Sequence, residues 1–264
     1  MARLNDTPIA AADLLEFATT DSDFGFEMRV LAQLRADGFN CLHSGTYCDP
    51  VTDKVRQFDI RATMDRGDST LALAVECKNL RPNNPLLVSA VPRTPEEAFH
   101  DLVVCRPQVT INWVIRPVTG DASPYKPEGM VGKKTDQVGR DTSKELTRND
   151  EATFEKLNQA VNSCHDLIRT LCSKASPPFR RVIVPVLVVP TGRLWQVDYA
   201  ADGTMTTSPR QVEKSELFLD HTWHVPGHYG QPLHYRLSHI QIVTFGALAG
   251  IAESWLGPGG FFPE

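Results

Sequence analysis

The stretch STLALAVECK, at residues 69–78, carries the clearest structural signal in this chain of 264 residues. Its pattern is typical of a β-strand, in which successive side chains point to opposite faces of the sheet. The apolar side chains predicted to face the core are Leu71, Leu73, Val75 and Cys77. Glu76 and Lys78 lie on the other face, so a carboxylate and an ammonium group are expected on one side of this strand.

A second strand is predicted immediately upstream, over residues 54–64 (KVRQFDIRATM). The two strands are expected to form a hairpin with its turn within residues 65–68 (DRGD). A loop of two or four residues places Asp59 opposite Ala74, and Asp59 is then a diagonal neighbour of Glu76, within about 7–8 Å on the same face. A three-residue loop would put the two carboxylates on opposite faces.

A helix is predicted over residues 24–36, with Ser22 or Asp23 as its cap. Its apolar stripe is expected to consist of Phe24, Met28, Leu31 and Leu34. Glu27 lies inside this stripe, so its carboxylate is predicted to point toward the core. Three carboxylates and one ammonium group should therefore meet at one patch.

The remaining elements complete an α/β pattern. The first of them are a Pro-rich loop over 81–95, a helix from Thr94 to about Val104, and an irregular polar segment over 106–149 in which a short strand over 109–115 stays open. They are followed by a helix over 150–171, a buried strand over 180–189 with a bulge or edge irregularity at Pro185, further strands over 194–199, 217–224 and 233–243, and a closing helix over 246–256. We predict one domain over residues 1–264, built as a central mixed β-sheet flanked by helices.

Composition restricts the function and the location. The chain has 27 Lys and Arg residues against 32 Asp and Glu residues, a net charge of −5, which argues against nonspecific coating of nucleic acid by charge alone. No stretch approaches the ~20 apolar residues of a membrane span, so no membrane partner is expected. The six cysteines have no CxxC spacing, and the N-terminus lacks a basic start followed by an apolar run. We expect a reduced, cytoplasmic protein.

The predicted patch has the composition of a metal-dependent hydrolytic site. Two or three carboxylates make a hard oxygen site that suits Mg²⁺ or Mn²⁺. Such an ion polarises a phosphoryl oxygen and lowers the pKa of a bound water. A nearby lysine can orient or deprotonate that water, or offset charge in the transition state. The residues therefore predict hydrolysis of phosphodiesters.

Glu27, Asp59 and the run Glu76-Cys77-Lys78 resemble the motif of the PD-(D/E)XK superfamily, the restriction-endonuclease-like nucleases. The resemblance implies that Asp59 and Glu76 bind Mg²⁺, or Mn²⁺ as a substitute, with the backbone carbonyl of Cys77 as a third ligand. It implies that Lys78 positions or activates the attacking water. Glu27 is expected to bind a second metal or to hold metal-bound water.

The order of elements from about residue 20 to 200 is similar to the core of that superfamily. Phe58 stands where the name-giving proline would be. We place the core at about 20–80 and 150–200, an insertion at about 81–149, and C-terminal strands and a helix at 215–257. The insertion follows the ExK strand and is longer than the link that the superfamily usually has there.

Three further residues are weaker candidates. Gln159 lies on the polar stripe of the helix over 150–171, and the resemblance implies that a polar residue of this helix lies beside the active site; an ordinary solvated face is the alternative. Lys133 and Lys134, in the insertion, are predicted to contact phosphates of a nucleic acid, with a plain exposed loop as the alternative.

The predicted function is that of a metal-dependent endonuclease that hydrolyses DNA, as an effector nuclease of a bacterial defence system or together with a partner protein. Three alternatives stay open: a catalytically silent nuclease-fold scaffold or sensor, an RNase, and a purely structural salt-bridge network of Glu27, Asp59 and Lys78. The superfamily often dimerises to cut two strands, so a homodimer is a further expectation.

Overall fold

The computed structural model of the chain describes residues 7–20, 22–106, 112–172, 179–226, 232–257 and 261. The helices are α1 (Ala11–Thr20), α2 (Phe24–Ala36), α3 (Glu151–Cys172) and α4 (Ile251–Leu256). The strands are β1 (Asn40–His43), β2 (Thr46–Cys48), β3 (Val55–Gln57), β4 (Ile60–Arg66), β5 (Ser69–Cys77), β6 (Leu86–Pro92), β7 (Phe99–Arg106), β8 (Asn112–Thr119), β9 (Met130–Arg140), β10 (Leu146–Arg148), β11 (Arg180–Val189), β12 (Leu194–Asp198), β13 (Arg210–Gln211), β14 (Lys214–Pro226) and β15 (Pro232–Thr244).

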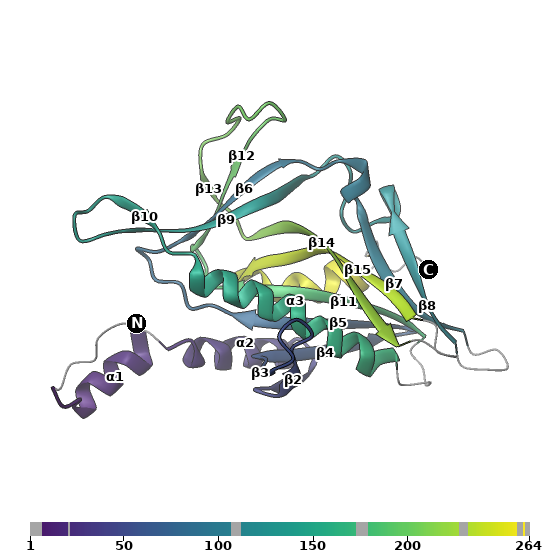
Figure 1. Ribbon diagram of the computed structural model, residues 1–264, viewed down its shortest axis with the longest axis horizontal. Coiled ribbons are helices and arrows are strands. Elements are labelled where there is room, and N and C mark those ends of the chain that lie inside the picture. Colours follow the sequence, from purple (N-terminus) through teal and green to yellow (C-terminus); the bar gives the residue numbers. More distant parts are fainter. Residues whose placement is uncertain are drawn as a thin grey trace.

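A mixed sheet of 13 strands forms the centre of the molecule (Figure 1). Its main path runs β1-β4-β5-β11-β15-β14-β9-β6-β12-β13, while β2 and β3 pair with each other. β5 and β15 flank β11 and run parallel to it, and β4 is antiparallel to β5. The central strands β5 and β11 are buried almost throughout, as expected for parallel strands covered on both faces. The chain is thus α/β, with a large mixed sheet flanked by helices, as predicted.

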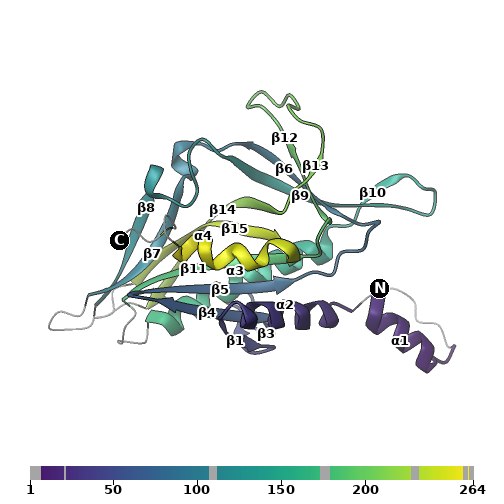
Figure 2. The ribbon, with the colours of Figure 1, turned by 180° about the vertical axis from the view of Figure 1, so that it is seen from behind.

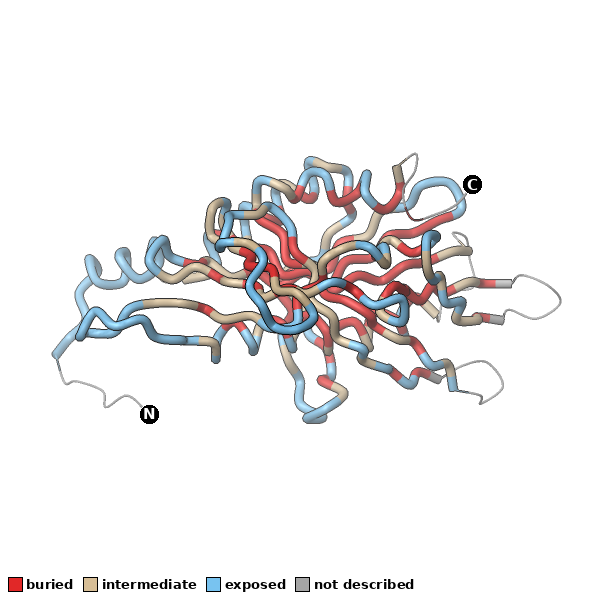
Figure 3. Tube along the Cα trace, turned by 90° about the horizontal axis from the view of Figure 1, so that it is seen from above, coloured by how far each residue is buried: buried red, intermediate tan, exposed pale blue. Residues whose placement is uncertain are grey.

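Helices cover the two faces of the central strands: α3 on one, α2 and α4 on the other (Figures 1 and 2). The pleat of β5 divides its side chains between these layers. Leu71, Leu73 and Val75 join the core under α2 and α4, whereas Ala72 and Ala74 pack under α3. By the same alternation Glu76 faces α3. Figure 3 shows the buried residues concentrated in these central strands.

The β4–β5 hairpin closes one residue later than predicted. Arg66 pairs with Ser69, so the loop consists of Gly67 and Asp68, and Gly67 adopts a φ of +57° that glycine tolerates best. The register is consequently shifted by two residues, which leaves the face of every side chain unchanged. Asp59 therefore lies directly opposite Glu76 and not diagonally from it.

Residues 81–149 are more regular than we predicted, both in the expected loop over 81–95 and in the expected irregular segment over 106–149. They contain the five strands β6–β10, and β6 and β9 extend the main sheet beyond β14. The helix predicted from Thr94 is wrong, because the capping box of Thr94 and Glu97 supports only a 3-10 turn, Pro95–Glu97. β7 follows at once and pairs with β8 and with the start of β11.

Three local predictions also need correction. The buried face of α2 is formed by Phe26, Val30, Leu31 and Leu34, and the predicted stripe residues Phe24 and Met28 are exposed. The predicted strand over 54–64 is interrupted at Phe58 and Asp59, between β3 and β4. Pro185 lies within the regular β11–β5 ladder, and the β11–β15 ladder begins one residue later, at Val186.

The other elements agree with the sequence. α3, β11, β12, β14 and β15 lie close to their predicted positions, and the closing helix is divided into a 3-10 segment (Phe245–Gly250) and α4. None of the helices in the described ranges has the length and apolar character needed to cross a membrane.

Candidate functional site

Asp59 and Glu76 are joined at the open end of the β4–β5 hairpin, beyond the pair Ile60–Val75. The N–H of Cys77 donates to Asp59 Oδ2 at 2.8 Å, and the N–H of Asp59 donates to Glu76 Oε1 at 3.3 Å. Glu76 has no exposed surface, and Asp59 is 9% exposed. The strand pairing therefore holds two carboxylates side by side in a desolvated position on the α3 face.

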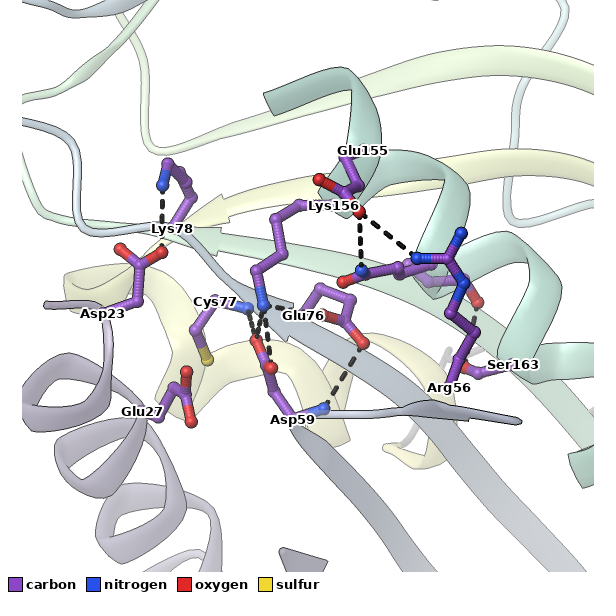
Figure 4. A network of polar contacts seen from close by, with 12 residues as sticks. Asp23, Glu27, Arg56, Asp59, Glu76, Cys77, Lys78, Glu155, Lys156 and Ser163 are labelled. Atoms are coloured by element: carbon purple, nitrogen blue, oxygen red, sulfur yellow. Dashed lines mark hydrogen bonds and ion pairs between the residues drawn. The ribbon is translucent and has the colours of Figure 1, made fainter. Parts of the chain in front are cut away.

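Lys156 compensates this pair. Its Nζ lies 2.8 Å and 2.6 Å from the two carboxylate oxygens of Asp59, and 3.0 Å from Glu76 Oε2 (Figure 4). Lys156 comes from the second turn of α3, which packs on β5 and β11. One ammonium group thus links a helix to two adjacent strands, and it is charged because two acids surround it.

The electrostatics of the three groups favour a neutral cluster. Burial, and secondarily the negative charge of Asp59, raise the pKa of Glu76 to about 8. Burial alone would lower the pKa of Lys156, but the charges of Glu76 and Asp59 outweigh it and raise that pKa. A protonated Glu76 leaves Asp59 and Lys156 as a balanced ion pair, which costs less in a buried position than two carboxylates against one ammonium.

Glu27 approaches the pair from α2, on the other side of the sheet. Its Oε2 lies 3.4 Å from Nε2 of His43, at the end of β1. Burial raises the pKa of Glu27, with a smaller contribution from the charge of Asp59. Figure 4 shows Glu27 beside Asp59 and Cys77. Glu27 thus reaches Asp59 from the α2 face of the sheet, whereas Glu76 lies on the α3 face.

Lys78 does not occupy the place that the sequence predicts. Its Nζ donates to Asp23 Oδ2 at 2.9 Å, and the N–H of Asn79 donates to the other oxygen of Asp23 at 2.8 Å. The prediction that the ammonium group of Lys78 meets Asp59 and Glu76 at one patch is wrong, because β5 ends at Cys77 and the chain then turns toward the start of α2. Figure 4 shows this ion pair separate from the Lys156 cluster.

Gln159 lies one helical turn beyond Lys156 and points elsewhere. Its Nε2 donates to Glu155 Oε1 at 3.5 Å, and Glu155 also pairs with Arg56 at 3.5 Å. Gln159 lines a cavity of about 600 Å³ between α3 and the β2–β3 hairpin. The structure therefore brings Lys156, and not Gln159, from α3 to the carboxylates.

Lys133 and Lys134 lie on β9, at a β-bulge opposite Ser89 and Ala90. Lys133 forms an ion pair with Glu97, and Lys134 forms one with Asp136 at 2.7 Å. Both line a cavity of about 250 Å³ beside Phe154 and Phe218. Their contact with phosphates stays a prediction, since each ammonium group already has an acidic partner.

The oxygen atoms of Asp59 and Glu76 fit a magnesium ion chemically. Mg²⁺ is usually bound by one or two carboxylates, with waters and substrate phosphates completing its shell. Within the described residues, no cluster of three or more His, Cys, Asp or Glu side chains is arranged to hold a metal ion. The carboxylate pair would consequently need the backbone carbonyl of Cys77, water or substrate as further ligands. The ammonium group of Lys156 would also have to move from its present position between the two carboxylates.

Sequence reasoning missed Lys156, although a signal existed. The polar stripe of α3 that contains Gln159 continues one turn toward the N-terminus, to Lys156. Helical periodicity identified the correct stripe, but not which of its turns lies over Glu76.

Comparisons of the chain with protein-family models, with curated proteins and with solved structures each found no match.

Proposed function

We propose that this chain is a metal-dependent nuclease that hydrolyses phosphodiester bonds of DNA, with a restriction-endonuclease-like core around β4, β5 and α3. The observation that carries the proposal is the buried Asp59–Glu76–Lys156 cluster, in which two carboxylates of adjacent strands share one ammonium group. Buried ionisable groups with strongly shifted pKa values are typical of functional sites. The resemblance of the motif residues supports the same proposal.

In this proposal Lys156 takes the role that the motif resemblance implies for Lys78. Asp59 and Glu76 would hold the divalent ion, which supplies polarisation of the phosphoryl oxygen and activation of a water. The Cys77 N–H orients Asp59 through its 2.8 Å hydrogen bond. Lys156 would hold the attacking water or offset charge on the phosphate, from a helix that the core fixes in place. Glu27 would hold a water of the metal shell from the α2 side. Its raised pKa means that this carboxylate is charged over a narrower pH range than an exposed glutamate.

One observation favours a second candidate, a nuclease-fold module that does not cut. Lys156 already satisfies both carboxylates, and no third metal-ligating side chain joins them within the described residues. In a module that does not cut, the sole role of the cluster would be to hold α3 on the sheet. A defence setting and a partner protein or homodimer are proposals that depend on the nuclease assignment. An RNA substrate remains the alternative to DNA, and a cytoplasmic location remains a separate proposal.

A cleavage assay separates the two candidates. Purified protein is incubated with supercoiled plasmid and with a single-stranded oligonucleotide, in Mg²⁺, in Mn²⁺ and in EDTA. We expect cleavage in either metal and none in EDTA. Glu76→Gln should abolish cleavage, whereas Glu213→Gln, an exchange at a carboxylate far along the chain on the loop before β14, should leave it intact. Absence of cleavage by the wild-type protein in both metals would favour the silent module.

A further inference from the structure

Next to the proposed active site lies a polar cavity of about 350 Å³ that no part of the proposed chemistry uses. It is bounded by the end of α1, by the loop after β5, and by β9 and the start of α3. The polar side chains that line it include Lys78, Asn79, Arg81, Asn83, Gln137 and Asn149. The cavity therefore combines cationic groups with an unusual number of carboxamides.

Two residues that line the cavity lie close in sequence to the catalytic cluster. Lys78 follows Glu76 by two residues. Ala152 precedes Lys156 by four residues, so the two lie on one face of α3. Both relationships place the cavity where β5 ends and α3 begins.

Two of the carboxamides are available to a ligand. Asn83 and Asn149 are exposed, and within the part of the chain that the structure describes their side chains form no hydrogen bond. Each therefore offers an N–H donor and a C=O acceptor to the cavity. The edge of a nucleobase carries donors and acceptors that match such a group.

We propose that this cavity binds one unpaired nucleotide of the substrate, with its base edge on the carboxamides and its phosphate on Lys78 and Arg81. Carboxamides offer a donor and an acceptor together and so match base edges, while lysine and arginine hold phosphates without reading sequence. The start of α3 adds a helix dipole that favours negative charge. An adjoining hollow of about 440 Å³ shares Asn79, Arg81 and Asn83 and adds Arg193, which gives the strand a path onward.

The carboxamides of the cavity carry the specificity. A base inside a duplex keeps its pairing edge occupied, so a base that reaches these carboxamides must be unpaired or flipped out. The inference rests on the proposed function and sharpens it: the preferred substrate is single-stranded, or locally opened, nucleic acid. The segment 81–149 then has a role, because Gln137 and Asn149 supply one wall.

Binding can be measured without cleavage, in EDTA, by fluorescence anisotropy of labelled 12-nucleotide probes. The probes are a single strand, its duplex, and an abasic strand with the same number of phosphates. We expect the single strand to bind at least tenfold more tightly than the duplex and the abasic strand. The double exchange Asn83→Ala/Asn149→Ala should weaken single-strand binding about tenfold, and should leave binding of the abasic strand unchanged.

The control is Asn158→Ala, an exposed asparagine of α3 that lines other cavities. It should bind all three probes like the wild type. Equal affinity of the three probes, or an unchanged affinity of the double variant, would overturn the inference, as would an equal loss in the control. Because these assays need no catalysis, a protein that binds as expected but never cuts would contradict the proposed nuclease and leave the nucleotide site standing.

Discussion

Lys156 and Asp59 are separated by 97 positions in the chain, yet their charged groups are 2.6 Å apart in the fold. This ion pair, with Glu76 as its third member, ties α3 to the two strands that carry the motif. Because all three groups are largely buried, none of them can lose its partner without exposing a charge to an apolar surrounding. The ion pair therefore stabilises the fold in the absence of substrate. In our proposal, the same groups act on the substrate once it is bound.

The first prediction concerns stability. Lys156→Met should lower the free energy of unfolding by about 3 kcal/mol at pH 7, since it leaves Asp59 without its compensating charge. Urea denaturation followed by circular dichroism measures this. Lys54→Met, which removes an exposed lysine in the loop before β3, should change it by no more than about 0.5 kcal/mol. A loss of similar size in both variants would show that the cluster is not a stabilising unit.

The second prediction distinguishes the roles of Lys156 and Lys78 by their effects on kcat and KM with a single-stranded substrate. Lys156→Gln should reduce kcat about 100-fold or more with little change in KM, because its ammonium group acts on the reacting atoms. Lys78→Gln should mainly raise KM, because this lysine lines the nucleotide cavity and is paired with Asp23. The reverse pattern, with kcat lost in the Lys78 variant, would restore the role that the motif resemblance implies for Lys78.

How far the sequence predicts this site can be seen residue by residue. The alternation of β5 places Glu76 away from the core face of Leu73 and Val75, and the hairpin parity places Asp59 beside it, even though the turn was shifted by one residue. Lys156 could not be found in this way, because the rotation of α3 over the sheet depends on packing between distant segments. At Thr94 the local signal was correct, since its capping box is present. The helix predicted from it does not form, because the residues that follow pair as β7 with β8 and β11.

The third prediction concerns acid sensitivity. Burial lowers the pKa of His100 to about 3 and that of His239 to about 2, while both would titrate near 6.5 in the unfolded chain. Below pH 6.5 the unfolded state therefore binds protons that the folded state does not. Each of these histidines should therefore lower the free energy of unfolding by about 2 kcal/mol between pH 8 and pH 5. Glu76 contributes with the opposite sign, because its raised pKa makes the folded state bind a proton over the same range.

Urea denaturation at several pH values checks this third prediction. Relative to the wild type, His100→Leu should make the difference in unfolding free energy between pH 5 and pH 8 about 2 kcal/mol more favourable at pH 5. His234→Leu, at an exposed histidine of β15, should leave the pH dependence as it is in the wild type. An unchanged pH dependence in the His100 variant would mean that other groups cause the acid sensitivity.

The fourth prediction tests the basic residues of β9. If Lys133 and Lys134 contact phosphates, replacing both by Ala should weaken nucleic-acid binding and lower the slope of log K against log salt by about 2. Binding at a series of salt concentrations measures the slope. An unchanged slope would indicate that Glu97 and Asp136 keep these lysines in structural ion pairs.

The most direct test of the central claim is a crystal structure of the protein with Mn²⁺ and a short oligonucleotide, recorded with anomalous diffraction. The nuclease proposal predicts an anomalous peak bound by oxygen atoms of both Asp59 and Glu76, with the ammonium group of Lys156 moved from between them toward the phosphate. A crystal soaked with Mn²⁺ in which Lys156 still bridges the two carboxylates, and no anomalous peak lies beside them, would contradict it.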